Sequence, residues 1–357
     1  MSDSEAANLM HDLYVLGGVQ RPQFRDVQEE WRLFEKALIG QVSVSDGGAR
    51  ICREYDSPAD ARADDSSSVL FKSGWVEAGR LYVCTSTEVL IFQVPELRQT
   101  GYISLPFFND LHHVRPTPRG TLAVVVTGLD MVSEITREGE LVKNWSTIEG
   151  QTTPQYSSTV DYRKIPTLKP YRSHPNFAFW AQDELWVSRG DLGDAICLAD
   201  PERRIHLPTR ECIHDGWVRQ GRIYFTSVDG RLFVIHENNL KTEAVYDLNT
   251  FSAGETTGYS WCRGVLPVDD HLAWVCFTRI RQTRWKEKVQ WIKNIVRGFP
   301  RPTCIALYDL AAGKVLREIN LEPMGMHAVF NAVPVPLAAP PAAAENDHLP
   351  AAEPIPI

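Results

Sequence analysis

The chain of 357 residues lacks the features that would place it in a membrane or on a nucleic acid. No stretch approaches the roughly 18 consecutive apolar residues that a membrane-spanning helix needs. The first residues are polar and acidic, with no cationic start before an apolar run, so they do not read as a secretory signal. A net charge of −8 argues against general nucleic-acid binding, which requires a basic surface. We therefore expect no transmembrane segment and no nucleic-acid partner.

Cysteine pairs and common catalytic motifs are also missing. The seven cysteines are scattered, odd in number and without a C-x-x-C pair, and several lie inside apolar runs. This pattern favours buried free thiols in a reducing compartment, so we expect a cytoplasmic protein. The chain has no P-loop, no dinucleotide fingerprint, no G-x-S-x-G elbow and no zinc-ribbon spacing. None of these motifs therefore indicates a function for this chain.

One repeated pattern is present instead. A histidine-bearing strand, a tight turn with Gly or an acidic residue, and an apolar strand follow one another three times between residues 107 and 225. Strand, turn and strand in this order predict a β-hairpin. The three clear copies and three weaker ones begin near Asn109, Ser173, Ile213, Lys72, Trp261 and Met326. Internal self-similarity of this kind is typical of repeat architectures.

The repeat predicts an all-β protein, because two further strands follow most hairpins and four strands make a propeller blade. Five blades are visible within residues 41–336. A sixth would be shared between the chain ends: the hairpin at residues 41–53 would complete the unit begun at residues 326–336, as in propellers that close without free edges. We predict a six-bladed β-propeller closed by N- and C-terminal strands, with seven blades as the alternative.

Three segments depart from the repeat. Residues 1–40 are predicted to be an N-terminal segment with a short helix, because the apolar residues of 23–39 fall on one helical face. The insertion 279–300 interrupts the fifth blade, and within it 279–297 has the spacing of a basic amphipathic helix. We interpret it as a lid or cap, with homo-oligomer formation, another partner or a membrane surface as alternatives. The Ala- and Pro-rich tail 337–357 is expected to be disordered.

The first strand of each blade lines the central channel, so residues at one register should face a shared cavity. We aligned the copies on the apolar residue that opens each second strand. The aligned column contains Lys72, His113, Asn176, His214, Arg263 and His327, with His174 two residues before Asn176. A lone histidine is usually structural. The recurrence of histidine at one register favours a functional site.

Two kinds of chemistry fit these histidines. Neutral imidazoles bind divalent metals, so His113, His174, His214 and His327 are candidate ligands of an axial ion such as Fe, Mn, Zn or Cu. Such an ion could polarise a substrate oxygen or activate water.

A metal-free pocket is the other interpretation. Imidazoles beside Arg263 and Lys72 would bind a carboxylate, sulfate or phosphate group, with one histidine as general base or nucleophile. The carboxylates of Asp110 and Asp215 are candidates to orient an imidazole. Turn or strand-end hydrogen bonding would explain both carboxylates equally well.

Several motifs resemble the arylsulfotransferase-like group of bacterial propellers, including its uncharacterised cytoplasmic members. The residues that carry the resemblance are Asn109–His113, Ser173–Asn176, His214–Tyr224, Trp261–Gly264 and Phe277–Arg281. The resemblance covers roughly residues 67–331. In true arylsulfotransferases a channel histidine receives the sulfuryl group while Arg and other His residues stabilise its oxygens. The resemblance implies such roles for His113, His214, His327 and Arg263.

Three hypotheses follow. The first is a metal-dependent enzyme with lyase, isomerase or oxidase type chemistry on a small polar or anionic substrate, using Arg263, Lys72 and Asp215 beside the histidine-bound ion. The second is a metal-free sulfuryl or group transferase that uses an axial histidine. The third is a non-catalytic ligand-binding or scaffold propeller whose histidines form a packed polar core.

Overall fold

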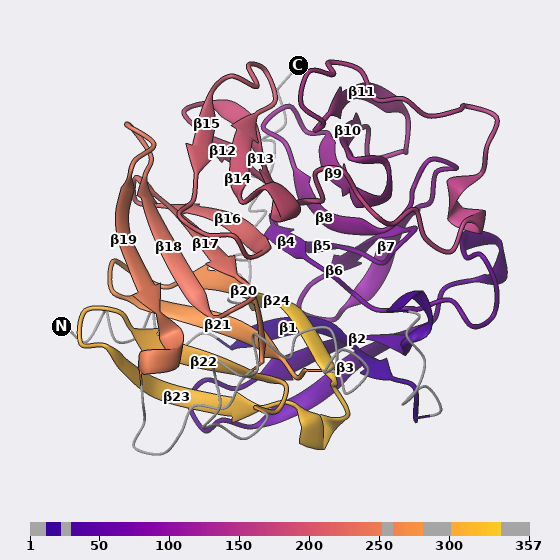
Figure 1. The fold of residues 1–357 in the computed structure, drawn as a ribbon. Coiled ribbons are helices and arrows are strands. Elements are labelled where there is room, and N and C mark those ends of the chain that lie inside the picture. The colour runs from indigo at the N-terminus through magenta and orange to yellow at the C-terminus, as the bar shows by residue number, and fades with distance from the viewer. Residues whose placement is uncertain (1–11, 23–29, 252–259, 281–300, 337–357) are drawn as a thin grey trace, which may run out of the picture.

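The protein is a six-bladed β-propeller in which each blade is a four-stranded antiparallel sheet (Figure 1). The computed structural model describes residues 12–22, 30–251, 260–280 and 301–336. Within these residues there is no α-helix, and no helix is long and apolar enough to cross a membrane. The prediction of six blades is confirmed, and the seven-bladed alternative is wrong.

In each blade, the strand named first below is the innermost one and lies next to the propeller axis. The first three blades are β4 (Gly74–Glu77), β5 (Arg80–Cys84), β6 (Val89–Gln93) and β7 (Arg98–Ile103); β8 (Leu111–Pro116), β9 (Leu122–Val126), β10 (Met131–Ile135) and β11 (Leu141–Ser146); and β12 (Pro175–Ala181), β13 (Glu184–Arg189), β14 (Asp194–Cys197) and β15 (Arg204–His206). The others are β16 (Ile213–Arg219), β17 (Arg222–Ser227), β18 (Arg231–His236) and β19 (Thr242–Asp247); β20 (Trp261–Pro267), β21 (Leu272–Thr278), β22 (Cys304–Asp309) and β23 (Lys314–Asn320); and β24 (Ala328–Pro334), β1 (Leu13–Gln20), β2 (Phe34–Val42) and β3 (Ala49–Tyr55).

Short 3-10 turns connect some of these strands. They are η2 (Glu30–Arg32), η3 (Ala59–Ala61), η4 (Thr127–Leu129), η5 (Tyr162–Lys164), η6 (Gly190–Leu192), η7 (Leu248–Thr250) and η9 (Glu322–Met324).

The apolar pattern explains the order of strands from the axis outward. Second strands such as β9 are buried along their whole length, because a neighbouring blade covers each face. Outermost strands such as β23 alternate between exposed and partly buried residues, because only one face is covered. The core therefore consists of apolar layers between adjacent blades rather than one central cluster.

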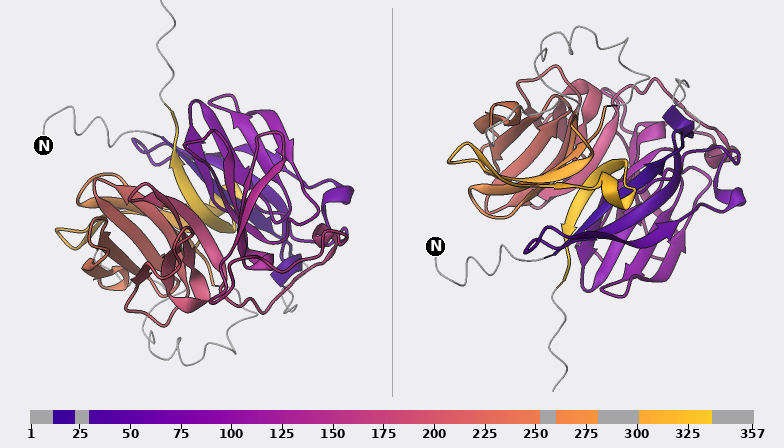
Figure 2. Two further views of the ribbon diagram at one scale, coloured as in Figure 1. Left: turned by 90° about the horizontal axis from the view of Figure 1, so that it is seen from above. Right: turned by 90° about the horizontal axis from the view of Figure 1, so that it is seen from below.

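The two ends of the chain meet in the sixth blade, as predicted. β24 pairs antiparallel with β1, so Leu13 lies opposite Pro334 and Leu16 opposite Asn331. The yellow C-terminal strand lies beside the indigo N-terminal strands in both views of Figure 2. The inner strands also contact one another in a closed ring, β24 with β4 and β20 with β24. Such closure removes the free sheet edges that would otherwise be open to pairing with other chains.

The predicted N-terminal helix is wrong where the structure describes it. Residues 34–39 lie in β2, preceded only by the 3-10 turn η2, while residues 23–29 lie outside the described residues. Short apolar runs fit helix and strand spacing alike, and pairing on both sides with β1 and β3 decided the outcome. The propeller therefore begins at Leu13, not at the predicted boundary of residue 41.

Two other predictions concern segments outside the described residues. The proposed helical insertion at 279–300 falls almost entirely on residues 281–300, and the Ala- and Pro-rich tail is residues 337–357. Both stay predictions.

Candidate functional site

β-Bulges aim polar side chains of the inner strands at the propeller axis. Five inner strands each shift register once where they pair with the neighbouring strand. They are β8, β12, β16, β20 and β24. The residues that the shifts leave unpaired include His112, Asn176, Asp215, Arg263 and Phe330. A bulge bends its strand and redirects the side chain at the extra residue. All five line the axial pocket described next or the small cavity beside it, together with the neighbouring His214.

Residues from all six blades line a pocket of about 330 Å³ on the axis. One residue from each blade, in chain order, is Lys72, His112, His174, His214, Arg263 and Phe330. A smaller cavity lies against the same region and is bordered by His112, Asn176, His214 and Asp215. We call the larger cavity the axial pocket.

The channel is filled on the other side of these residues. Trp75 follows Lys72 by three residues, and Trp217 follows His214 by three. The two tryptophans come from opposite blades, and their rings stack with centroids 4.4 Å apart. The Arg115 guanidinium lies 4.1 Å from the Trp75 ring, a cation–π contact. Rings from opposite blades can meet only across the axis. The axial pocket is therefore a blind pocket rather than a through-channel.

Asp110 anchors one wall of the pocket. Its carboxylate accepts hydrogen bonds from Lys72 Nζ and from the Tyr171 hydroxyl, and His112 Nε2 lies 3.4 Å from Asp110 Oδ2. Burial by itself would raise the pKa of Asp110, but the Lys72 charge holds it well below its usual range. Burial also lowers the pKa of Lys72, against the attraction of Asp110. We treat this pair as ionised, because each charge compensates the other at contact distance.

His112 is held by the side chain of Asn176. Its Nδ1 lies 2.5 Å from Asn176 Oδ1, and Asn176 Nδ2 donates a 2.7 Å hydrogen bond to the Ile213 carbonyl. Asn176 thus presents its oxygen, so His112 Nδ1 carries the proton in this bond. Burial and the nearby Lys72 charge lower the pKa of His112 to about 3, although Asp110 acts in the opposite direction. His112 is therefore a neutral imidazole of defined tautomer.

His214 and Arg263 form the opposite wall. Arg263 Nη1 lies 3.3 Å from His214 Nε2, and the Arg263 guanidinium lies 4.3 Å from the Phe330 ring. Because guanidinium groups only donate, His214 Nε2 must be the unprotonated nitrogen. Burial and the Arg263 charge hold the pKa of His214 well below its usual range.

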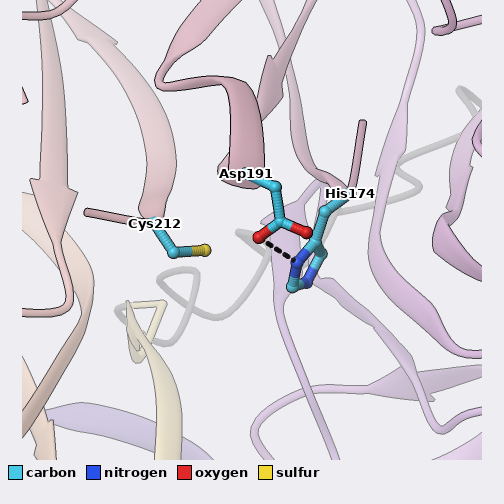
Figure 3. A group of neighbouring side chains, drawn as sticks. All are labelled: His174, Asp191 and Cys212. Carbon is cyan, nitrogen blue, oxygen red and sulfur yellow. Dashed lines mark hydrogen bonds and ion pairs between the residues drawn. The ribbon is translucent and has the colours of Figure 1, made fainter. Parts of the chain in front are cut away.

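His174, Asp191 and Cys212 gather at a third position in the same pocket (Figure 3). His174 Nδ1 is 3.1 Å from Asp191 Oδ1, and one donor atom of each of the three residues lies within 4.8 Å of the others. The His174 ring also lies edge-to-face against His112, with centroids 5.2 Å apart. An imidazole, a carboxylate and a thiol therefore face one another at the pocket wall.

His113 does not reach the pocket, contrary to the prediction. It is fully buried between blades, stacks on Phe177 at 3.6 Å, and its Nδ1 accepts a 3.1 Å hydrogen bond from the Ala178 N–H. Burial, and next the Arg115 charge, hold its pKa well below the usual range. The bulge in β8 places His112 at the axis instead, so the alignment was one residue out of register here.

His327 is also outside the pocket. It precedes β24, is only half-buried, and its Nδ1 accepts a 3.1 Å hydrogen bond from the Gln20 N–H. Phe330 occupies the axial position of this blade. The four predicted metal ligands therefore do not converge: His174 and His214 line the pocket, whereas His113 and His327 do not.

Asp215 lies on the axial side but has a structural partner. Its Oδ2 accepts a 2.8 Å hydrogen bond from the Val265 N–H of the next blade, and its carboxyl borders the small cavity. Burial raises its pKa to about 8, although the Val265 N–H acts in the opposite direction. Asp215 is therefore a protonated, buried carboxyl at neutral pH rather than an exposed catalytic acid.

Sequence reasoning missed several pocket residues. Tyr171, Asp191 and Cys212 come from loops between strands, where no periodic pattern points to the axis. His112 was not in the aligned column, because its neighbour His113 took that place. Of the aligned column, Lys72, Asn176, His214 and Arg263 are placed as predicted.

Comparison with known proteins supports the fold alone. No family model matches this chain, and no curated protein is similar to it in sequence. The structure is similar to a protein of unknown function from Bacteroides caccae, with a TM-score of 0.60 and 12% identity, over 91% of this chain and 99% of that one. It is more distantly similar to a streptogramin B lyase, with a TM-score of 0.47 and 13% identity, over 87% and 88% of the two chains. Virginiamycin B lyase from Staphylococcus aureus also has a TM-score of 0.47, with 11% identity, over 87% of this chain and 85% of that one.

Proposed function

We propose that the axial pocket is the active site of an enzyme that acts on a small anionic substrate. Arg263 is the anion clamp, Lys72 supports it from the opposite wall, and His214 contacts the reacting atoms. The proposal concerns this pocket only and requires no metal ion.

The observation that carries this proposal is the charge of the pocket. Five basic side chains line it, against three carboxylates, although the chain as a whole carries a net charge of −8. The basic residues are Arg62, Lys72, Arg163, Lys169 and Arg263, and the acidic ones are Asp110, Asp191 and Glu211. Lys72, Arg62 and Arg163 each form an ion pair with a carboxylate, so the excess of positive charge is small. Anion binding therefore depends mainly on Arg263, whose guanidinium lies beside His214. A blind pocket of this volume accommodates a small molecule.

The contact between Arg263 and His214 suggests how a substrate would react. In this structure the guanidinium donates to His214 Nε2. A bound sulfate, phosphate or carboxylate group would engage the same guanidinium in the bidentate geometry that such anions prefer. The Nε2 lone pair would then face the substrate, where it can take up a proton or attack an electrophilic atom.

Sulfuryl transfer is the specific form of this chemistry that the resemblance to arylsulfotransferases suggests. A bond would form between His214 Nε2 and the sulfur, and the bond from sulfur to the donor oxygen would break. The electron pair of that bond leaves on the donor oxygen, which then takes up a proton. Proton abstraction by the same nitrogen is the alternative, and only sulfuryl transfer leaves a covalent adduct.

The two other hypotheses are less well supported by the geometry. The axial four-histidine metal site is not proposed again, because His113 and His327 lie outside the pocket. A purely structural histidine core would fill the axis, whereas here a cavity of about 330 Å³ is bordered by His112, His174 and His214.

Calorimetric titration with sulfated, phosphorylated and carboxylated ligands tests the proposal. We expect at least one class to bind to the wild type, and Arg263→Ala to weaken binding about 10- to 100-fold, the cost of a charge-assisted hydrogen-bonded pair. Arg263→Lys should bind at an intermediate level, because it keeps the charge without the planar fork. The exposed Arg80 of β5 provides the matched control, so Arg80→Ala should bind as the wild type does.

His214→Gln separates binding from reaction. It should keep ligand binding within a few-fold and abolish turnover of any ligand that the wild type converts. Mass spectrometry of the wild type after incubation with a sulfated donor identifies an adduct on His214 if transfer occurs. Equal binding of every anion to wild type and Arg263→Ala would refute the anion clamp.

A further inference from the structure

We propose that His174, Asp191 and Cys212 bind a divalent cation of the zinc class at the wall of the axial pocket. This inference goes beyond the proposed function, which needs no metal, and it replaces the four-histidine set expected from the sequence. The cobalt(II) and zinc(II) ions are the probes that test it.

The first argument is the donor set. One imidazole nitrogen, one carboxylate oxygen and one thiol sulfur lie within 4.8 Å of one another (Figure 3). Nitrogen and sulfur donors together select zinc-like ions over magnesium and calcium, which prefer oxygen alone. Three protein ligands with one open position form the arrangement of catalytic rather than structural zinc sites.

The second argument is the backbone, which brings the three residues together from two blades. His174 precedes β12, Asp191 lies in η6 after β13, and Cys212 precedes β16 of the next blade. The Gly190 N–H donates a 2.7 Å hydrogen bond to the His174 carbonyl. A Cβ added to Gly190 would lie only 2.7 Å from Cys212 Sγ. Glycine at this position therefore permits the thiol to approach the strand connection that carries Asp191.

The Asp130 carboxylate holds the backbone at Ser173 and His174 in place. Asp130 Oδ1 accepts hydrogen bonds from the backbone N–H groups of Ser173 and His174, at 2.8 and 3.0 Å. His174 has a φ of 56°, a left-handed conformation that is uncommon outside glycine. Such conformations persist where the surrounding bonds determine them, and they concentrate at functional sites. The imidazole is therefore presented by a fixed backbone.

The location gives the site its chemical meaning. All three residues line the axial pocket, as Arg263 and His214 do. A cation there would add positive charge to the pocket and could bind an oxygen of the anionic substrate as a Lewis acid. The small-molecule class expected at the site is thus an oxyanion, and this step rests on the proposed function.

Cobalt(II) titration of metal-free, untagged protein is the test. We expect one equivalent to bind with visible bands of tetrahedral intensity and a thiolate-to-cobalt charge-transfer band, and zinc to displace it. Binding should release protons, because the thiol must ionise. Cys212→Ser should lose the charge-transfer band, and Asp191→Asn should weaken binding by more than about tenfold. Cys52→Ser, a change at a partly buried thiol in β3, should leave the spectrum unchanged.

Two outcomes would overturn the inference. One is wild-type protein with no thiolate band at excess cobalt. The other is unchanged affinity in both Cys212→Ser and Asp191→Asn when circular dichroism shows that both variants are folded. Arg263→Ala should keep the cobalt spectrum, so failure of the metal site and failure of the anion clamp are measured separately.

Discussion

His112 and His113 are neighbours in β8 with opposite surroundings. His112 lines the axial pocket and bonds Asn176, whereas His113 is buried between blades against Phe177. Strand alternation explains why they face opposite sides, but not which side is the axis. The bulge in β8 decides that, because His112 is the residue that it leaves unpaired.

Substitution separates the two roles. His113→Ala leaves the Ala178 N–H without its acceptor and removes a ring stacked at 3.6 Å, so the free energy of unfolding should fall by about 2–4 kcal/mol. His112→Gln should change it by less than about 1 kcal/mol, because glutamine can also donate an N–H to Asn176 Oδ1. Urea denaturation measures both values.

Ligand titration supplies the complementary result. His113→Ala should bind anions as the wild type does under conditions where it is folded, while His112→Gln should bind them more weakly. A His112→Gln variant that loses as much stability as His113→Ala would contradict this division of roles.

Among the strands, a recurrent side-chain bond joins adjacent blades at every second boundary of the ring. His113, Asp215 and Asn331 each occupy the inner strand one residue after the axial position, and each accepts a backbone N–H from the next blade. The donors are Ala178, Val265 and Gly74, at 3.1, 2.8 and 3.5 Å. Three chemically different acceptors thus satisfy the same kind of buried donor. Of the three, only Asp215 has a carboxyl group.

Asp215 should therefore make stability depend on pH. Burial raises the folded-state pKa of Asp215 to about 8, from the 3.8 that is usual for an aspartate, so the folded protein keeps a proton that the unfolded chain loses. Stability should accordingly fall as pH rises between these two values, by at most about 1.4 kcal/mol per pH unit from this group. Asp215→Asn keeps an acceptor oxygen, as Asn331 does, and should remove this slope.

Urea denaturation of wild type and Asp215→Asn at a series of pH values measures the effect. At pH 8, Asp215→Asn should have a higher free energy of unfolding than the wild type. At pH 4, the difference between the two proteins should be smallest. Parallel pH profiles for the two proteins would show that Asp215 is ionised in the folded state.

At the scale of the whole molecule, closure of the ring depends on strands from both chain ends. β1 lies between β24 and β2 and pairs with both. Gly17 sits where this packing is tightest, because a Cβ there would lie 1.8 Å from the Ala328 carbonyl oxygen. The sixth blade therefore cannot form without residues that were predicted to lie outside the propeller.

Deletion of residues 1–40 tests this directly. It removes β1 and most of β2, which leaves β24 without its neighbour in the sheet. We expect loss of the cooperative unfolding transition and self-association through the exposed strand edges, measured by urea denaturation and light scattering. A monomeric product that unfolds cooperatively at the wild-type midpoint would instead support the original boundary at residue 41.

The sequence by itself determined the class of fold, the number of blades and the closure of the ring by the two chain ends, although not that β1 is the strand that pairs with β24. It also determined four members of the axial column, Lys72, Asn176, His214 and Arg263. These predictions rest on local patterns: strand alternation, turn residues and repetition of one hairpin motif.

Only the tertiary structure decided which histidines meet. A single extra residue in β8 places His112, and not His113, at the propeller axis. The sequence does not mark where such a bulge will form. Asp191 and Cys212 reach His174 through loops of two blades, so no spacing along the chain could bring them together. The same holds for residues 34–39, whose apolar pattern suits helix and strand alike until β1 and β3 pair on either side. Each of these outcomes depends on contacts between segments far apart in the chain, and local patterns carry no information about such contacts.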